Sequence, residues 1–291
     1  MPDRAAAEQS NEEGHEASDR GETMAAEHAY RAAIAADPEW SVPYYNLGLL
    51  YKYQSRWAES AAMNARAAAL SPEDQASWWN LGIAATALGR WREARRAWRA
   101  CGVAVDDGDE PPVFTWGQTP IRLDADGLGE VVWARRLDPA RARIVSVPLP
   151  TAAHRWGDIV LNDGAPDGER VVDGHTYHVF NALAVLEESR FETFVVELAS
   201  VPDGAIAVLA AIAEEQGGAA EHWGEATRIL CHECSHGVVH DHHKDEAPPA
   251  HPHCGLAALD PAQAETILAR WLEQTGADVI KWYVAPRPAG A

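Results

Sequence analysis

The stretch that decides the fold lies at residues 78–98 and reads WWNLGIAATALGRWREARRAW. The stretch at residues 44–64, YYNLGLLYKYQSRWAESAAMN, has the same Leu-Gly pair and the same tryptophan 34 residues earlier. Pro38 and Pro72 are separated by the same step, and each closes an alanine-rich run. A fixed step of this size indicates repeated pairs of short helices, because neither helix of a pair can bury its apolar face alone.

Side-chain size within each unit fits this prediction. Small residues would let the two helices approach closely, and the proline would end the second helix. One step back from Gly48 lies Gly14, and one and two steps back from Gly89 lie Ser55 and Gly21. We expect large side chains to fill the space between neighbouring hairpins; these are Tyr51, Trp57, Trp91 and Trp98.

The pattern resembles the tetratricopeptide repeat (TPR) family over roughly residues 7 to 106. The third unit matches it at Trp78, Leu81, Gly82, Gly89, Trp91, Ala94 and Trp98. The second matches at Tyr44, Leu47, Gly48, Tyr51, Trp57, Ala67 and Pro72, and the first at Ala26, Tyr30, Ala33 and Pro38. We therefore expect all-α TPR helical-hairpin repeats at 21–105. Residues 1–20 would be a flexible acidic N-terminus or a degenerate first helix.

The resemblance also implies a binding role. In the family, the first helix of each hairpin lines a concave groove that receives a protein or peptide segment. By register, the groove positions are Tyr45, Leu49, Lys52, Tyr53, Trp79, Ile83 and Thr86. Family members that grip a terminal carboxylate use Lys and Asn where this chain has Tyr45 and Leu49, so an apolar segment is the better ligand. The occupant could also be the protein's own C-terminal domain.

Composition excludes several partners and places. A formal net charge of −20 repels phosphate backbones and anionic membranes, so we expect neither nucleic acid nor membrane binding. The longest apolar run, residues 205–213, is too short to span a bilayer. With no secretory signal and only four cysteines, two of them in a Cys-x-x-Cys pair, a cytoplasmic location is expected.

Arginines recur at i, i+3, i+4 and i+7 along one side of the last repeat helix; they are Arg92, Arg95, Arg96 and Arg99. This stripe could receive an acidic partner. The preferred interpretation is a solvated face, or a contact with the acidic segment that follows, which contains Asp106, Asp107, Asp109 and Glu110.

A second domain follows the linker at 106–112 and occupies 113–285, with a tail at 286–291. Short β-prone runs at 131–133, 144–147, 158–161 and 193–198 predict strands, with turn signals at 162–164 and 167–168 between them. Helices are expected near 203–216 and at 261–275, and strands at 225–230 and 278–284. Helix-then-strand units after a mainly β region predict an α+β domain.

A Cys/His-rich loop at 231–254 is the most distinctive feature of this domain. Its density of sulfur and imidazole ligands predicts a structural zinc site. The candidate ligands are Cys231, Cys234, His240, His242, His253 and Cys254. The prediction for the whole chain is a non-enzymatic interaction scaffold fused to a zinc-stabilised domain.

A competing interpretation uses the same residues. His232-Glu233-Cys234-Ser235-His236 fits H-E-x-x-H, in which two histidines on a helix bind zinc and the glutamate polarises water. Gly237 directly follows the motif and a strand-like run precedes it, whereas this chemistry needs a sturdy helix. The alternative function is therefore a metal-dependent hydrolase or protease. No other catalytic motif is present, and no catalytic residue is assigned.

Overall fold

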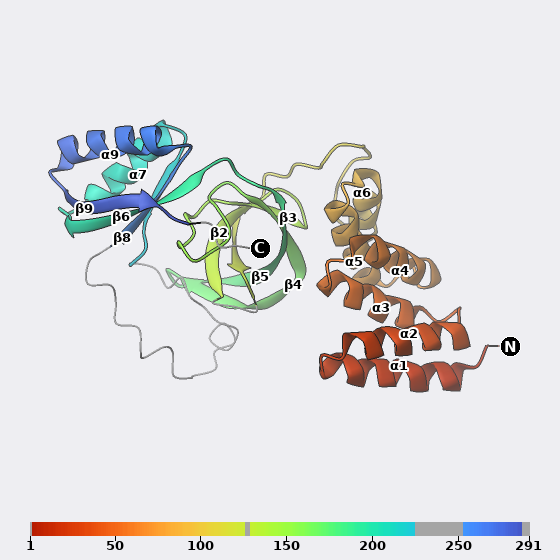
Figure 1. The fold of residues 1–291 in the computed structure, drawn as a ribbon. Coiled ribbons are helices and arrows are strands. Elements are labelled where there is room, and N and C mark those ends of the chain that lie inside the picture. The colour runs from red at the N-terminus through yellow and green to blue at the C-terminus, as the bar shows by residue number, and fades with distance from the viewer. Residues whose placement is uncertain (1, 126–128, 225–252, 287–291) are drawn as a thin grey trace. The chain divides into compact units, whose positions relative to one another are not determined.

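The computed structural model describes residues 2–125, 129–224 and 253–286 (Figure 1). The chain divides into two units. The first unit comprises Met1–Phe114 together with Asp138–Ala140, and the second comprises Thr115–Leu137 and Arg141–Ala291. In the described ranges, no helix has both the length and the hydropathy needed to cross a membrane.

The helical part of the first unit consists of three consecutive helical hairpins, as the repeat predicts (Figure 1). Each helix packs mainly against its neighbours along the chain. The degenerate N-terminal segment forms a regular first helix, capped by Asp3, whose Oδ1 accepts from the Ala6 amide at 3.1 Å. The hairpins are α1 (Arg4–Asp19) with α2 (Thr23–Ala36), α3 (Ser41–Tyr53) with α4 (Trp57–Leu70), and α5 (Gln75–Ala87) with α6 (Trp91–Ala100).

A glycine on the first helix of every hairpin faces a residue on the second helix. The three pairs, Gly14 with Tyr30, Gly48 with Asn64 and Gly82 with Trp98, follow each other at the 34-residue step. A Cβ atom at any of these glycines would overlap the opposing side chain, so only glycine allows the approach. The expectation for Trp98 was wrong in place: its ring packs across Gly82 inside its own hairpin, not between hairpins.

The turn between the helices of each hairpin uses a left-handed residue. Gly21, Ser55 and Gly89 have φ angles of 72°, 56° and 66°, again one step apart. Nothing lies within 4 Å of a Cβ built at Gly21 or Gly89, so the requirement there is backbone conformation and not space. Ser55 adopts this conformation with a side chain and is strained.

Replacing Ser55 by glycine is expected to raise the free energy of unfolding by about 0.5–1 kcal/mol, because left-handed strain is removed at some entropic cost. Urea unfolding followed by helical circular dichroism measures this. The matched change, Gly89→Ser, should lower stability by a similar amount. A Ser55→Gly variant no more stable than the parent would contradict the strain at this turn.

The second unit begins with a closed barrel of five strands, which the sequence did not predict. Successive strands pair antiparallel, and a parallel pairing of the first with the fifth closes the barrel. Small and branched apolar side chains fill it, among them Ile121, Val132 and Val160. The strands are β1 (Gln118–Leu123), β2 (Glu130–Arg136), β3 (Arg141–Ile144), β4 (Ile159–Val172) and β5 (His175–Glu187).

The predicted turns at 162–164 and 167–168 are wrong, because both lie inside strand β4. The pairing of β4 with β5 shifts register after Leu161, after Asn162 and after Pro166. Such irregularities bend a strand and help a sheet to close, which explains turn-forming residues in mid-strand. The fully buried Arg122 of β1 fixes this bend by donating to Asp167 at 2.6 Å.

The rest of the second unit is a four-stranded antiparallel sheet with helices α7 and α9 (Figure 1). Its core joins Phe194 and Leu256 of the sheet to Leu209 and Trp271 of the helices. The two predicted helices and the last strand are confirmed, and the strand expected at 225–230 lies outside the described residues. The sheet order is β7 (Ala219–His222), β8 (His253–Ala258), β6 (Glu192–Ser200) and β9 (Asp278–Val284); the helices are α7 (Ala205–Glu215) and α9 (Pro261–Thr275).

Burial makes His154, between β3 and β4, a source of acid sensitivity. Loss of solvent lowers the pKa of its imidazole below the ordinary 6.5, against the opposing pull of the Asp158 and Asp124 carboxylates. Above pH 6.5 the imidazole is neutral in both folded and unfolded states. As the pH falls below 6.5, the unfolded chain gains a proton that the folded protein resists, so stability is lost.

Replacing His154 by glutamine is therefore expected to flatten the dependence of unfolding free energy on pH below 6.5. Urea unfolding at a series of pH values measures the slope. An unchanged slope in the variant would show that other groups cause the acid sensitivity.

Candidate functional site

The first helices of the three hairpins, α1, α3 and α5, form what we call the first-helix face. The predicted groove residues lie on α3 and α5, where Tyr45 and Trp79 are one repeat step apart, as are Leu49 and Ile83. Tyr53 is 61 % exposed, whereas Lys52 and Ile83 are buried. Tyr45, Leu49 and Trp79 are half-buried, and the adjacent Thr86 is buried. The accessible part of the predicted site is therefore smaller and more aromatic than expected.

Amide side chains link the three helices across this face. Asn46 of α3 donates to Oδ1 of Asn11 on α1 at 2.9 Å. Lys52 donates to Oδ1 of Asn80 on α5 at 3.3 Å, and its ammonium lies 4.5 Å from the centre of the Tyr53 ring. Asn11 was missed at first, although stepping back 34 residues from Tyr45 finds it. These bonds hold the helices in register and engage the single cation of α3.

Trp79 carries an unused hydrogen-bonding group on this face. Its ring meets the Trp98 ring edge-on, with centroids 5.2 Å apart, so its position is fixed. The indole Nε1 of Trp79 and the hydroxyl of Thr86 are buried and have no hydrogen-bond partner among the described residues. Because buried polar groups are normally satisfied, these two atoms could receive bonds from a bound ligand.

Charge is unevenly spread over the first-helix face. Helix α1 has one arginine, Arg4, against five carboxylates: Glu8, Glu12, Glu13, Glu16 and Asp19. Helix α5 contains no charged residue. Burial raises the pKa of Tyr30, and the carboxylates of Asp19 and Glu12 add to this rise. The α1 end is therefore negative and the α5 end is apolar.

The repeat is now described by its register, its paired glycines and its left-handed turns. The first unit is a stack of TPR-type hairpins. No protein-family profile and no curated protein match the chain. Solved structures do resemble it over about a third of its length, and all those compared are TPR domains.

The first TPR domain of Spaghetti (RPAP3), bound to an HSP90 peptide SRMEEVD, is 23% identical, with a TM-score of 0.33; the match covers 34% of this chain and 79% of that one. The TPR domain of Arabidopsis OM64 is 19% identical, with a TM-score of 0.32 and coverage of 34% and 81%. The TPR2B domain of yeast Sti1, in complex with an Hsp70 peptide, is 22% identical, with a TM-score of 0.32 and coverage of 33% and 78%. The likeness concerns the fold alone.

The predicted metal ligands are only partly described. Cys231, Cys234, His240 and His242 lie outside the described residues, as does the H-E-x-x-H motif. His253 and Cys254 are not in a loop, as expected, but begin strand β8. In the ranges that the structure describes, no group of three or more His, Cys, Asp or Glu side chains could hold a metal ion.

The two described ligand candidates point to opposite faces of the sheet, because they are neighbours in one strand. Cys254 is fully buried in the apolar core beneath the helices. The Nε2 atom of His253 lies 3.6 Å from a Glu197 carboxylate oxygen, and that oxygen is 3.0 Å from the Lys281 ammonium. The structure therefore does not bring His253 and Cys254 together, and the zinc site stays a prediction.

Proposed function

We propose that the protein is an interaction scaffold whose first-helix face binds an extended polypeptide segment. The observation that carries this proposal is the row of aromatic side chains Tyr45, Tyr53 and Trp79 on a rigid hairpin stack. Aromatic side chains lose little conformational freedom on binding and dominate many interfaces. The unused indole N–H of Trp79 adds a donor for a backbone carbonyl of the segment.

The charges of this face support a specific ligand chemistry. Apolar side chains of the segment would lie over α3 and α5, and a basic residue would lie towards the carboxylates of α1. An acidic tail such as the SRMEEVD peptide of the RPAP3 complex suits the face poorly. Lys52, its central cation, already donates to Asn80, and Tyr45 and Leu49 replace the residues that grip a carboxylate in the family.

A peptide selection with the full chain tests this proposal. A random peptide library is displayed, and the peptides retained by the protein are sequenced and their affinities measured by fluorescence polarisation. We expect apolar residues and Lys or Arg to be enriched. The variant Tyr53→Ala should bind the selected peptides about tenfold more weakly or worse. Selection of acidic peptides would contradict the proposal.

Tyr44 provides the matched control, because it is a tyrosine on the same helix whose hydroxyl donates to the Pro38 carbonyl at 3.3 Å. Tyr44→Ala should leave peptide affinity within about twofold of the parent. Equal losses in Tyr44→Ala and Tyr53→Ala would mean that the peptide does not use the first-helix face. The competing occupant is the chain's own C-terminal part, which would make the parent bind every peptide weakly.

We also retain structural zinc as a proposal, supported by the ligand types at 231–254. The full chain is expected to bind zinc, and Cys231→Ser with Cys234→Ser should lower its metal content, measured by elemental analysis. Unchanged metal content in the double variant would contradict the ligand assignment. The hydrolase alternative would require a peptidase activity that Glu233→Gln abolishes while zinc is kept.

A further inference from the structure

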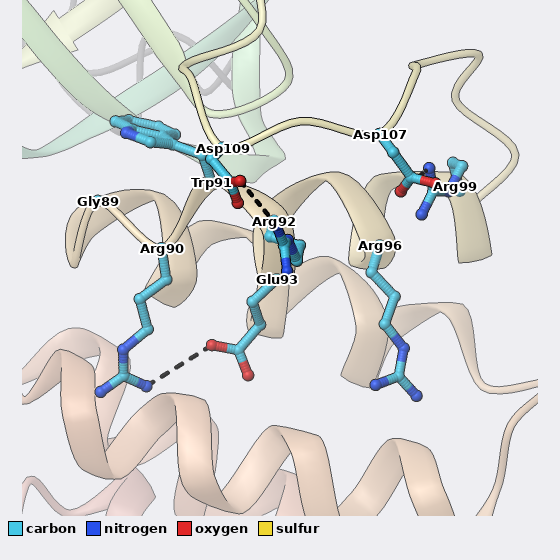
Figure 2. A pocket seen from close by; sticks show the side chains of 9 residues that line it. All are labelled: Gly89, Arg90, Trp91, Arg92, Glu93, Arg96, Arg99, Asp107 and Asp109. Atoms are coloured by element: carbon cyan, nitrogen blue, oxygen red, sulfur yellow. Dashed lines mark hydrogen bonds and ion pairs between the residues drawn. The ribbon is translucent and has the colours of Figure 1, made fainter.

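The arginine stripe of α6 is occupied by the chain's own acidic linker, as the preferred interpretation held. Arg92 pairs with Asp109 at 2.6 Å and Arg99 pairs with Asp107 at 2.5 Å (Figure 2). Between them, Arg95 donates to the backbone carbonyl oxygens of Asp106 and Glu110 at 2.7 and 3.1 Å. The arginines thus read both the carboxylates and the backbone of an acidic peptide.

The linker runs directly over the stripe. A Cβ built at Gly108 would lie 3.4 Å from the guanidinium carbon of Arg95, which is ordinary van der Waals contact. The sequence Asp-Asp-Gly-Asp-Glu of residues 106–110 therefore provides a template for the ligand that this surface accepts: carboxylates two residues apart on an extended backbone.

These contacts are suited to exchange. The Arg92 and Asp109 side chains are 76% and 67% exposed, and those of Arg99 and Asp107 are 39% and 81% exposed. Water and salt screen such pairs strongly, so they contribute little to stability. An outside segment with similar chemistry can displace the linker without disturbing the hydrophobic core of the hairpins.

The linker also leaves part of the basic surface uncovered. A pocket of about 670 Å³ lies beside α6, and its arginines are Arg90, Arg92, Arg96 and Arg99. Figure 2 shows Arg90, Glu93 and Arg96 pointing to the same side of the helix. Arg96 lies over the Trp78 ring, 5.4 Å from its centre, and has no carboxylate partner among the described residues. This guanidinium is positioned to bind one more acidic group than the linker supplies.

We propose that the arginine stripe is a second binding site, for an acidic segment of another protein, and that the linker at 106–110 is its built-in competitor. The site is separate from the first-helix face, because it belongs to a second helix of a hairpin and has the opposite ligand preference. A nucleic acid is the poorer ligand, since the chain carries a net charge of −20 and two carboxylates lie in the pocket.

A labelled peptide that copies residues 106–112, Asp-Asp-Gly-Asp-Glu-Pro-Pro, tests this proposal in fluorescence polarisation with the full chain. The double change Asp107→Asn with Asp109→Asn removes the competitor and should tighten peptide binding about three- to tenfold. The double change Arg92→Gln with Arg99→Gln should abolish binding. Arg66→Gln is the control, because Arg66 is an exposed arginine of α4 paired with Glu39 at 3.0 Å.

Melting curves confirm that each variant is folded, which the exposure of the altered residues favours. A linker variant that binds the peptide no more tightly than the parent overturns the proposal, as does equal weakening by Arg66→Gln. Displacement of the peptide by inorganic phosphate at equal concentration would reduce the surface to an unspecific anion site and would also overturn it. Equal binding of a peptide with Asn and Gln in place of Asp and Glu would do the same.

Discussion

Replacing Trp98 by alanine is expected to lower the free energy of unfolding of the first unit by about 3–5 kcal/mol. The side chain is fully buried, and its ring fills the space that Gly82 leaves open between α5 and α6. It also fixes Trp79 through an edge-to-face contact. Because its Nε1 has no hydrogen-bond partner among the described residues, the loss comes from packing alone. Urea unfolding followed by helical circular dichroism measures it.

Trp91 provides the matched control, since it lies on the same helix but is only half-buried. Trp91→Ala should cost about 1–2 kcal/mol. A loss for Trp98→Ala no larger than that for Trp91→Ala would show that the glycine–tryptophan contact does not hold the third hairpin together. Peptide binding at the first-helix face should fall along with stability in Trp98→Ala, because Trp79 loses its support.

Trp271→Ala in helix α9 is the second change with a large expected effect. Trp271 is fully buried in the core of the second unit, and its indole N–H donates to the Ala205 carbonyl of α7 at 2.7 Å. Loss of both the ring and this bond between the two helices should lower the unfolding free energy of the second unit by about 4–6 kcal/mol.

Trp271→Phe separates the two contributions, because it keeps an aromatic ring and removes the donor. It should cost about 1–2 kcal/mol, measured by urea unfolding of the full chain with circular dichroism sensitive to the β-structure. If Trp271→Phe were as damaging as Trp271→Ala, the hydrogen bond and not the ring would hold α7 to α9.

The hairpin stack could be predicted because its signal is registered many times. Leu47 and Leu81 fill the same place in successive repeats, and every glycine that permits close approach recurs at the same step. Even Ser55 could be placed at a turn by register alone. The family resemblance then located Tyr45, Leu49, Trp79 and Ile83 on the first-helix face. Their burial could not be predicted, since it depends on neighbours outside the repeat.

The barrel could not be predicted for a physical reason. Its closure needs a strongly bent β4, and the bend is made by Asn162, Asp163 and Gly164, residues that ordinarily end a strand. A short window therefore indicates a turn where tertiary pairing with β5 continues the strand. The local sequence also gave no sign that Arg122 would be buried, because its partner Asp167 is 45 residues away.

Photocrosslinking at position 53 tests most directly whether the first-helix face binds a polypeptide segment. A photoreactive amino acid replaces Tyr53 in the full chain, and in a second variant it replaces Trp57, on α4. After illumination with a selected peptide, mass spectrometry identifies the linked residues. We expect the peptide to crosslink from position 53 and not from position 57. Crosslinking from position 57 alone, or from position 53 only to residues 115–291 of the same chain, would contradict the proposed binding of an external segment.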